Sequence, residues 1–363
     1  MMHIAKQVLP ELTSAHVEGP FVTIMMNTQI TRQGMEQDQL KVKNFAKEAR
    51  MRFEKKYPTH NWAAVQENID QLIADQNFWR GNSKSVAMIF TESMTYVQRL
   101  HMATDDQYYV GDRPYILAMI KNNQYHHNYY MLCLNRDSMK MFQVMGSQVS
   151  EMELPNAPWT MEMALGEELT KPSMNHSSGG MMHGVGSKDE EMRIDWMNYY
   201  QAIDEYLCES FENEEGYPMY LFALPENQTM FHKMAKCSWL KTDMAINASP
   251  THHSLAMMKE RAAAFSQRLT ESMIMRYQTF ANRKSMEDLV DMIPAARDGR
   301  IRQLFIATSN LIDGFGEEPD LEYDKRMILN NLADHVSKNG GDVYILPQKH
   351  VPNNQRLFAT LRY

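Results

Sequence analysis

The sequence has few cysteines, no long apolar run and no excess of positive charge. Each of these three absences argues against a class of protein. Among 363 residues there are 3 cysteines, and none of them forms a CxxC pair, so neither a disulfide scaffold nor a cysteine zinc cage is expected. The apolar runs reach about six residues, whereas a membrane-spanning helix needs roughly 20. The N-terminal segment lacks the apolar stretch of a signal peptide. We therefore expect a soluble, cytoplasmic protein.

The overall charge is acidic, but one segment is basic. The chain carries 37 Lys and Arg against 45 Asp and Glu, a formal net charge of −8. This balance argues against a general nucleic-acid coat, although a local basic patch can still bind RNA. Residues 41–56 hold seven basic residues against two acidic ones, and Lys43, Lys47 and Arg50 are the predicted RNA contacts among them. A merely solvated helix face is the alternative, and the local excess favours phosphate contacts.

Alternating strand-like and helical patterns predict an α/β protein. Apolar residues recur at three- and four-residue steps over 35–56 and 61–77, which is typical of helices with one buried face. Turn signals and composition divide the chain into three predicted domains, 1–112, 113–253 and 254–363. The other predicted strands are 19–28, 85–90, 94–100, 114–120, 129–134, 139–145, 219–224, 301–307, 342–346 and 356–362, and the other predicted helices are 188–211, 226–236, 254–280, 286–297 and 322–337.

A glycine-rich loop is predicted over residues 171–187 of the central domain. It holds four glycines and two histidines, and Ser187 with Glu190 predicts a capping box at the start of the helix that follows. Glycines let backbone amides approach a ligand closely, and a helix start adds partial positive charge. An acid-free loop of this length could probe a narrow nucleic-acid cavity, and a surface loop without function is the alternative. The predicted RNA contacts here are His176, Ser177, Ser178, Gly179, Gly180, Met181, Met182, His183, Lys188 and Arg193.

Three common enzyme motifs do not fit the sequence, although a Ser-His-Asp triad cannot be read from sequence alone. The sequence does not match the phosphate-binding motif GxxxxGK[ST], whose two glycines are five residues apart. Here Gly180 and Gly186 are six residues apart, and Ser187 stands before Lys188. The adjacent pairs 126–127 and 252–253 are histidines, whereas zinc ligands on one helix face need a spacing of four. No GxSxG elbow is present. We expect no catalytic residues, no metal and no cofactor.

Two segments resemble a known family. HGVGSKDEE at 183–191 leads into a long predicted helix, and the chain closes on GGDVYILP, VP and LFATLRY within 340–363. Both are similar to the bacterial branch of the archaeal and eukaryotic class I release-factor and Pelota family. The resemblance implies a three-domain, tRNA-mimicking α/β architecture whose central loop reaches the peptidyl transferase centre. Release factors carry Gly-Gly-Gln at that loop, but residues 177–182 read SSGGMM, and an Asn-Ile-Lys-Ser codon-reading motif is also missing.

The function implied by this resemblance is binding without bond cleavage. We expect a ribosome hibernation factor that occupies the A site from the decoding centre to the peptidyl transferase centre and blocks elongation. The implied partners are the ribosome, through its 16S and 23S rRNA, and EF-Tu, whereas neither DNA nor a membrane is expected. Three alternatives stay open: a Pelota-like rescue factor for stalled ribosomes, a peptidyl-tRNA hydrolase with a diverged loop, and a protein-interaction module without an RNA role.

Overall fold

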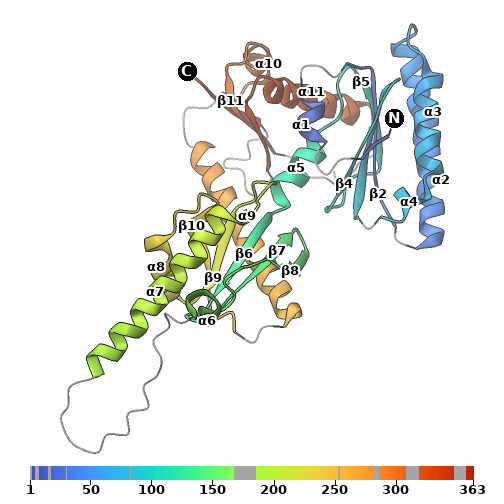
Figure 1. Cartoon of the computed structure of the whole chain (residues 1–363). Helices are drawn as coiled ribbons and strands as arrows, with labels where there is room; N and C mark the ends of the chain where they lie inside the picture. The colour runs from blue at the N-terminus through green and yellow to red at the C-terminus, as the bar shows by residue number, and fades with distance from the viewer. Residues whose placement is uncertain are drawn as a thin grey trace, which may run out of the picture. The chain divides into compact units, whose positions relative to one another are not determined.

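The computed structural model describes most of the chain, namely residues 2–4, 8–14, 18–29, 31–81, 83–166, 185–251, 254–281, 286–307, 319–346 and 357–363. The chain forms two compact units, which we call unit 1 (residues 1–126 and 270–363) and unit 2 (residues 127–269). Strands and helices are intermixed in both (Figure 1), so the predicted α/β class is confirmed. The predicted division into three domains stays a prediction, and the compact units divide at 126/127 and 269/270.

A five-stranded sheet with the order β1-β4-β3-β2-β5 forms one layer of unit 1. Its strands are β1 (Met2–Ile4), β2 (Phe21–Asn27), β3 (Ser85–Phe90), β4 (Thr95–Leu100) and β5 (Gln107–Gly111). β2 runs antiparallel to β3 and β5, β3 runs antiparallel to β4, and β1 is parallel to β4. Successive β2 side chains point to opposite faces, so Ile24 and Met25 belong to different cores.

The long helices α2 (Arg32–Lys56) and α3 (Trp62–Ala74) pack on one face of this sheet, and the short α4 (Gln76–Trp79) follows them (Figure 1). The predicted helices over 35–56 and 61–77 are thus confirmed, except that the second one ends at Ala74. There Asp75 accepts backbone hydrogen bonds from Asn77 and Phe78 and caps α4 instead. The buried stripe of α2 is Val42, Ala46, Ala49 and Phe53.

The other face of the sheet shares one core with the C-terminal part of unit 1. That part contains α10 (Leu289–Arg297), α11 (Pro319–Lys338) and a sheet with the order β12-β11-β13. Its strands are β11 (Ile301–Ala307), β12 (Asp342–Leu346) and β13 (Leu357–Leu361). Two more helices, α1 (Leu9–Leu12) and α5 (Leu117–Tyr125), contribute to the same core.

One predicted strand of unit 1 is wrong. The apolar run over residues 114–120 predicts a strand, but residues from Leu117 onward form the helix α5. A continuous apolar run fits a buried strand and a buried helix equally well, so periodicity alone does not distinguish them. The apolar residues of the run are buried all round because α5 lies inside the shared core.

Unit 2 is built on a five-stranded sheet with the order β10-β9-β6-β7-β8. Its strands are β6 (Asn128–Leu134), β7 (Met139–Met145), β8 (Gln148–Glu151), β9 (Met219–Ala223) and β10 (Leu240–Asn247). On one face lie α7 (Val185–Glu209) and α8 (Pro225–Met234), and on the other lies the first part of α9 (Leu255–Ala281) (Figure 1). The short α6 (Met161–Leu165) contacts α7.

The predicted capping box at the start of α7 is wrong. Val185 and Gly186 already belong to the helix, so Ser187 lies inside it. An N-cap residue has non-helical backbone angles and precedes the first helical residue, and Ser187 therefore cannot cap α7 through that motif.

Candidate functional site

The basic face of α2 is the first candidate site. Thr31 caps the helix, because its hydroxyl accepts a hydrogen bond from the Gly34 backbone N–H at 3.1 Å. The buried stripe of α2 faces the sheet, so the predicted contacts Lys43, Lys47 and Arg50 all lie on the exposed side. The structure thus places these three side chains on one helix and in solvent.

The basic side chains of α2 differ in how they are engaged. Arg50 forms an ion pair with Glu54 at 2.8 Å. Arg52 donates to the Tyr108 hydroxyl at 3.0 Å, and its guanidinium lies 4.3 Å from the centre of the Tyr323 ring. Lys43 and Lys47 form no ion pair within the described part of the chain, so their charges are available to a ligand.

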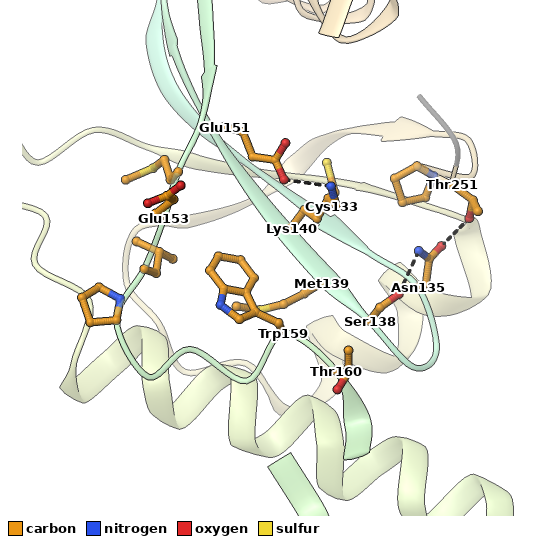
Figure 2. A pocket seen from close by; sticks show the side chains of 14 residues that line it. Cys133, Asn135, Ser138, Met139, Lys140, Glu151, Glu153, Trp159, Thr160 and Thr251 are labelled. Atoms are coloured by element: carbon orange, nitrogen blue, oxygen red, sulfur yellow. Dashed lines mark hydrogen bonds and ion pairs between the residues drawn. The ribbon is translucent and has the colours of Figure 1, made fainter. Parts of the chain in front are cut away.

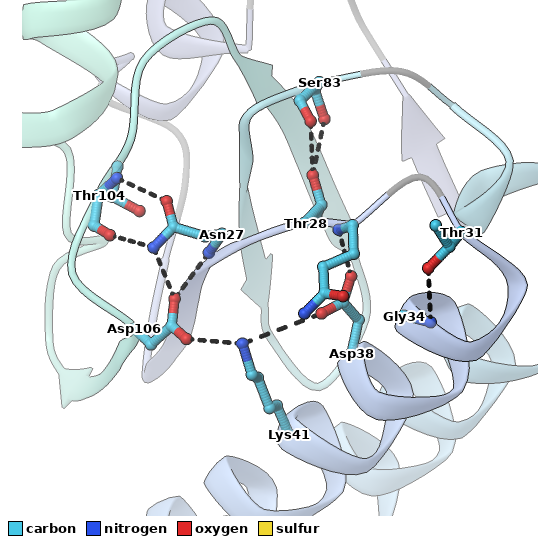
Figure 3. Close-up of polar contacts among 10 residues, drawn as sticks. Asn27, Thr28, Thr31, Gly34, Asp38, Lys41, Ser83, Thr104 and Asp106 are labelled. Atoms are coloured by element: carbon cyan, nitrogen blue, oxygen red, sulfur yellow. Dashed lines mark hydrogen bonds and ion pairs between the residues drawn. The ribbon is translucent and has the colours of Figure 1, made fainter.

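A polar network fixes the N-terminal half of α2 to the sheet (Figure 3). The Lys41 ammonium lies 2.9 Å from an Asp106 carboxylate oxygen, and the other Asp106 oxygen accepts hydrogen bonds from the Asn27 backbone and side chain. The Asp38 carboxyl is fully buried and accepts from the Gln29 backbone N–H at 2.7 Å. Burial raises the pKa of Asp38, while that hydrogen bond and Lys41 oppose the shift. Lys41 is therefore a structural cation, whereas Lys43 and Lys47 are not engaged in this network.

The glycine-rich loop is the second candidate site, and most of it lies outside the described residues. This applies to every predicted contact from His176 to His183 and to the Lys188 side chain. Arg193 is described, and it lies exposed on α7. The structure does not bring Arg193 together with the basic face of α2 in one described unit, because α2 belongs to unit 1 and α7 to unit 2.

The first described turns of α7 expose apolar residues beside Arg193. Met192 is 60% exposed, Ile194 52% and Met197 41%. The helix becomes buried further along, where Tyr199, Tyr200 and Ile203 enter the core of unit 2. Contiguous exposed apolar patches can mark binding surfaces, so this end of α7 is a candidate contact surface. The sequence pattern did not single out these three residues.

A cavity of about 990 Å³ lies in unit 2 beside β7 and the segment that follows β8 (Figure 2). At one end Asn135 donates to the Ser138 hydroxyl at 3.2 Å, and Thr251 donates to Asn135 at 3.1 Å. At the other end Lys140 and Glu151 form an ion pair at 2.8 Å. Trp159 also lines the cavity and lies beside Met139 in Figure 2.

The charges around this cavity do not favour an RNA phosphate. Lys140 contributes +1, while Glu151 and Glu153 contribute −2, so the lining carries −1. Sequence reasoning missed the cavity entirely, because its lining combines residues between 133 and 160 with residues 250 and 251, which share no motif. It is not part of the predicted RNA-binding surface.

Within the described ranges, no three His, Cys, Asp or Glu side chains are grouped so that they could hold a metal ion. No helix in the same ranges is long and apolar enough to cross a membrane.

One known family model matches a part of the chain that coincides with unit 2. Residues 127–268 match the model of bacterial archaeo-eukaryotic release factor family 6. The match begins and ends within one residue of the borders of unit 2. It supports the release-factor family that the sequence resemblance indicated, and it locates that similarity in the unit that contains α7 and the glycine-rich loop. No curated protein matches the chain.

Several solved structures are similar at low identity. A ribosome-bound archaeal Pelota, in a model with ABCE1, is 11% identical, with a TM-score of 0.38. The similarity covers 64% of this chain and 61% of the Pelota chain, so this chain spans less than two thirds of the length of that Pelota. Dom34 of S. cerevisiae is 10% identical, with a TM-score of 0.36 over 77% of this chain and 74% of that one. The archaeal translation termination factor aRF1 is 9% identical, with a TM-score of 0.22 over 98% of this chain and 96% of that one.

Proposed function

We propose that this chain is a ribosome-binding factor that occupies the A site as a tRNA mimic and blocks elongation without breaking a bond. The match of residues 127–268 to a release-factor family model carries this proposal. Lys43 and Lys47 support it, because two exposed cations without ion pairs in the described chain suit RNA phosphates. In the finer form of the proposal, the chain is a ribosome hibernation factor similar to Balon.

The proposed contacts follow from the two candidate surfaces. The basic face of α2 would bind 16S rRNA near the decoding centre, where each phosphate contact adds salt-dependent affinity. The glycine-rich loop, with Lys188 and Arg193 at the start of α7, would enter the peptidyl transferase region of the 23S rRNA. Recognition would come from shape and backbone contacts, which is the usual mode for folded RNA. Occupation of the A site would exclude aminoacyl-tRNA and so halt elongation.

A translational GTPase is the second proposed partner. Dom34 is described as interacting with Hbs1, a statement that concerns that yeast protein. For this chain we propose EF-Tu, on the family resemblance of residues 183–191 and 340–363. Co-purification of EF-Tu with the chain, in the presence of GTP or GDP, tests this partner separately from the ribosome.

Ribosome co-sedimentation tests the function. The full chain, a variant without Ser177–His183, and the double variant Lys43→Gln/Lys47→Gln are each mixed with vacant 70S ribosomes and spun through sucrose. We expect the full chain to pellet with ribosomes and both variants to pellet less. If the full chain stays in the supernatant, the proposal is wrong. If the deletion variant binds ribosomes and inhibits translation as well as the full chain does, the loop has no role.

Two assays distinguish the alternatives. Release of labelled peptide from peptidyl-tRNA on ribosomes would identify a hydrolase, and the proposal expects none because residues 177–182 contain no Gly-Gly-Gln. Accelerated splitting of stalled ribosomes into subunits would identify a Pelota-like rescue factor. A hibernation factor instead protects intact ribosomes and lowers translation in proportion to its occupancy.

A further inference from the structure

Two of the three cysteines lie next to each other in unit 2. Cys208 is exposed near the C-terminal end of α7, and Cys237 is buried in the turn between α8 and β10. Cys133, the third cysteine, lies on β6 in the core on the opposite face of the sheet. The sequence separation of Cys208 and Cys237 gives no hint of this proximity.

The Asp204 carboxylate holds Cys237 beside α7. It is buried and accepts hydrogen bonds from the backbone N–H groups of Lys236, at 3.0 Å, and Cys237, at 3.2 Å. Residues four apart lie on the same face of a helix, so Asp204 and Cys208 point in the same direction. The anchored turn therefore presents Cys237 to the side chain of Cys208.

The two thiol groups are near neighbours, because Asp204 binds the backbone of Cys237 and stands one helical turn before Cys208. Burial raises the pKa of Cys237, and the Cys208 side chain is among the groups that lower it. A disulfide requires the two Cβ atoms to approach within about 3.5–4.5 Å. Rotation of the exposed Cys208 side chain would bring its sulfur toward Cys237.

We propose that Cys208 and Cys237 form an oxidative modification site, at which a peroxide converts the two thiols into one disulfide. The Cys208 thiolate attacks one peroxide oxygen, the O–O bond breaks, and the leaving hydroxide takes up a proton as water, which gives a sulfenic acid. The Cys237 thiolate then attacks the Cys208 sulfur, the S–O bond breaks, and a second water leaves. The two thiols lose two electrons in total, and the peroxide is reduced to two waters.

The disulfide would link the C-terminal end of α7, the helix that follows the glycine-rich loop, to the segment before β10. It would close a ring from residue 208 to residue 237, which contains β9 and α8. A cross-link of this size restricts the unfolded chain. We expect the melting temperature of unit 2 to rise by about 5 °C or more on oxidation and to fall back when dithiothreitol is added.

The surroundings of the two thiols determine the rate of this oxidation. Loss of solvent around the thiol first, and then the nearby groups Asp204, Cys237 and Glu209, raise the pKa of Cys208, while Lys236 lowers it. Burial also raises the pKa of Cys237. Because the thiolate is the reacting form, the oxidation should be slow at neutral pH and speed up by close to tenfold per pH unit. This behaviour fits a response to sustained oxidation rather than a fast sensor.

Peptide mass spectrometry tests the proposal. The reduced full chain is treated with hydrogen peroxide, its free thiols are alkylated after unfolding, and the digested peptides are sequenced. We expect one linked pair that joins Cys208 to Cys237, while Cys133 is recovered alkylated. The variant Cys133→Ser is the matched control and should form the same link, whereas Cys208→Ser should form none.

Three outcomes would overturn the proposal. They are oxidation of Cys208 to a sulfinic acid without a link, a disulfide that joins two copies of the chain through Cys208, and a link to Cys133. Since Cys237→Ser alters a buried position, the exposed Cys208→Ser carries the negative control. Its melting temperature should match the reduced wild type and should not change with peroxide.

Discussion

Arg326 on α11 donates a hydrogen bond to the Asp105 carboxylate, although 221 residues separate them in sequence. The two side chains are 8% and 7% exposed. Arg326 also donates to Gln107 and to the Tyr109 hydroxyl. A buried charge without its partner is costly, so this pair ties the C-terminal part of unit 1 to the end of its first sheet.

Replacement of Arg326 by alanine should strongly destabilise unit 1. Asp105 would then keep a buried negative charge without this cation, at a cost of about 3–5 kcal/mol. Urea unfolding followed by circular dichroism measures the loss. Lys140→Ala is the matched control, because Lys140 pairs with Glu151 on the surface, where ion pairs contribute about 0–1 kcal/mol. Equal effects of the two variants would show that the Arg326 pair does not stabilise the unit.

Local sequence patterns predicted many of the helices and strands. They could not predict which strands pair with each other across long sequence distances. The apolar stripe of α2 and the strands β11 and β12 were predicted at or near their observed bounds, because each is a continuous periodic run between turn signals. β5, β8 and β10 were not predicted. Their residues alternate weakly, and they are strands because β2, β7 and β9 offer them an edge.

In the candidate sites, too, the sequence predicted exposure but not side-chain contacts. The sequence predicted that Lys43, Lys47 and Arg50 are exposed, because they lie opposite the apolar stripe. It could not show that Arg50 is paired while Lys43 and Lys47 are not, since that depends on side-chain geometry. The proximity of Cys208 and Cys237 could not be predicted either, because the buried carboxylate of Asp204 brings together two segments about 30 residues apart.

Neutralisation of Lys43 and Lys47 should lower the salt dependence of ribosome binding. Each phosphate contact contributes roughly 0.7–0.9 to the slope of log K against log salt concentration, so Lys43→Gln/Lys47→Gln should reduce the slope by up to about 2. Binding is measured by fluorescence anisotropy from 50 to 300 mM KCl. Both side chains are exposed, so the melting temperature should stay within about 2 °C of the wild type.

The control for this pair is Lys233→Gln. Lys233 is exposed on α8 and belongs to neither predicted surface, so its loss should leave the slope unchanged. If Lys233→Gln lowers the slope as much as the double variant does, the basic face of α2 has no special role in RNA binding.

His232 should make unit 2 less stable in mild acid. Its Nε2 atom is buried and has no hydrogen-bond partner in the described chain, and burial lowers the pKa of His232 below its usual 6.5. The unfolded state then binds more protons than the folded state as pH falls below 6.5, so the free energy of unfolding decreases over that range. The drop in urea midpoint between pH 7.5 and 5.5 should be smaller in His232→Gln. An unchanged drop would mean that His232 does not contribute to it.

The two compact units should differ in their ability to fold alone. Residues 127–269 form a continuous segment with a complete sheet and a core on each face, so this fragment should unfold cooperatively in urea. Residues 1–126 lack α11, which supplies Arg326 and part of the shared core, so that fragment should be far less stable alone. Co-expression with residues 270–363 should restore a soluble, cooperatively folded complex. If residues 1–112 instead fold alone as stably as unit 1 does in the full chain, the N-terminal part is an independent domain, and the core shared with residues 292–359 contributes little to its stability.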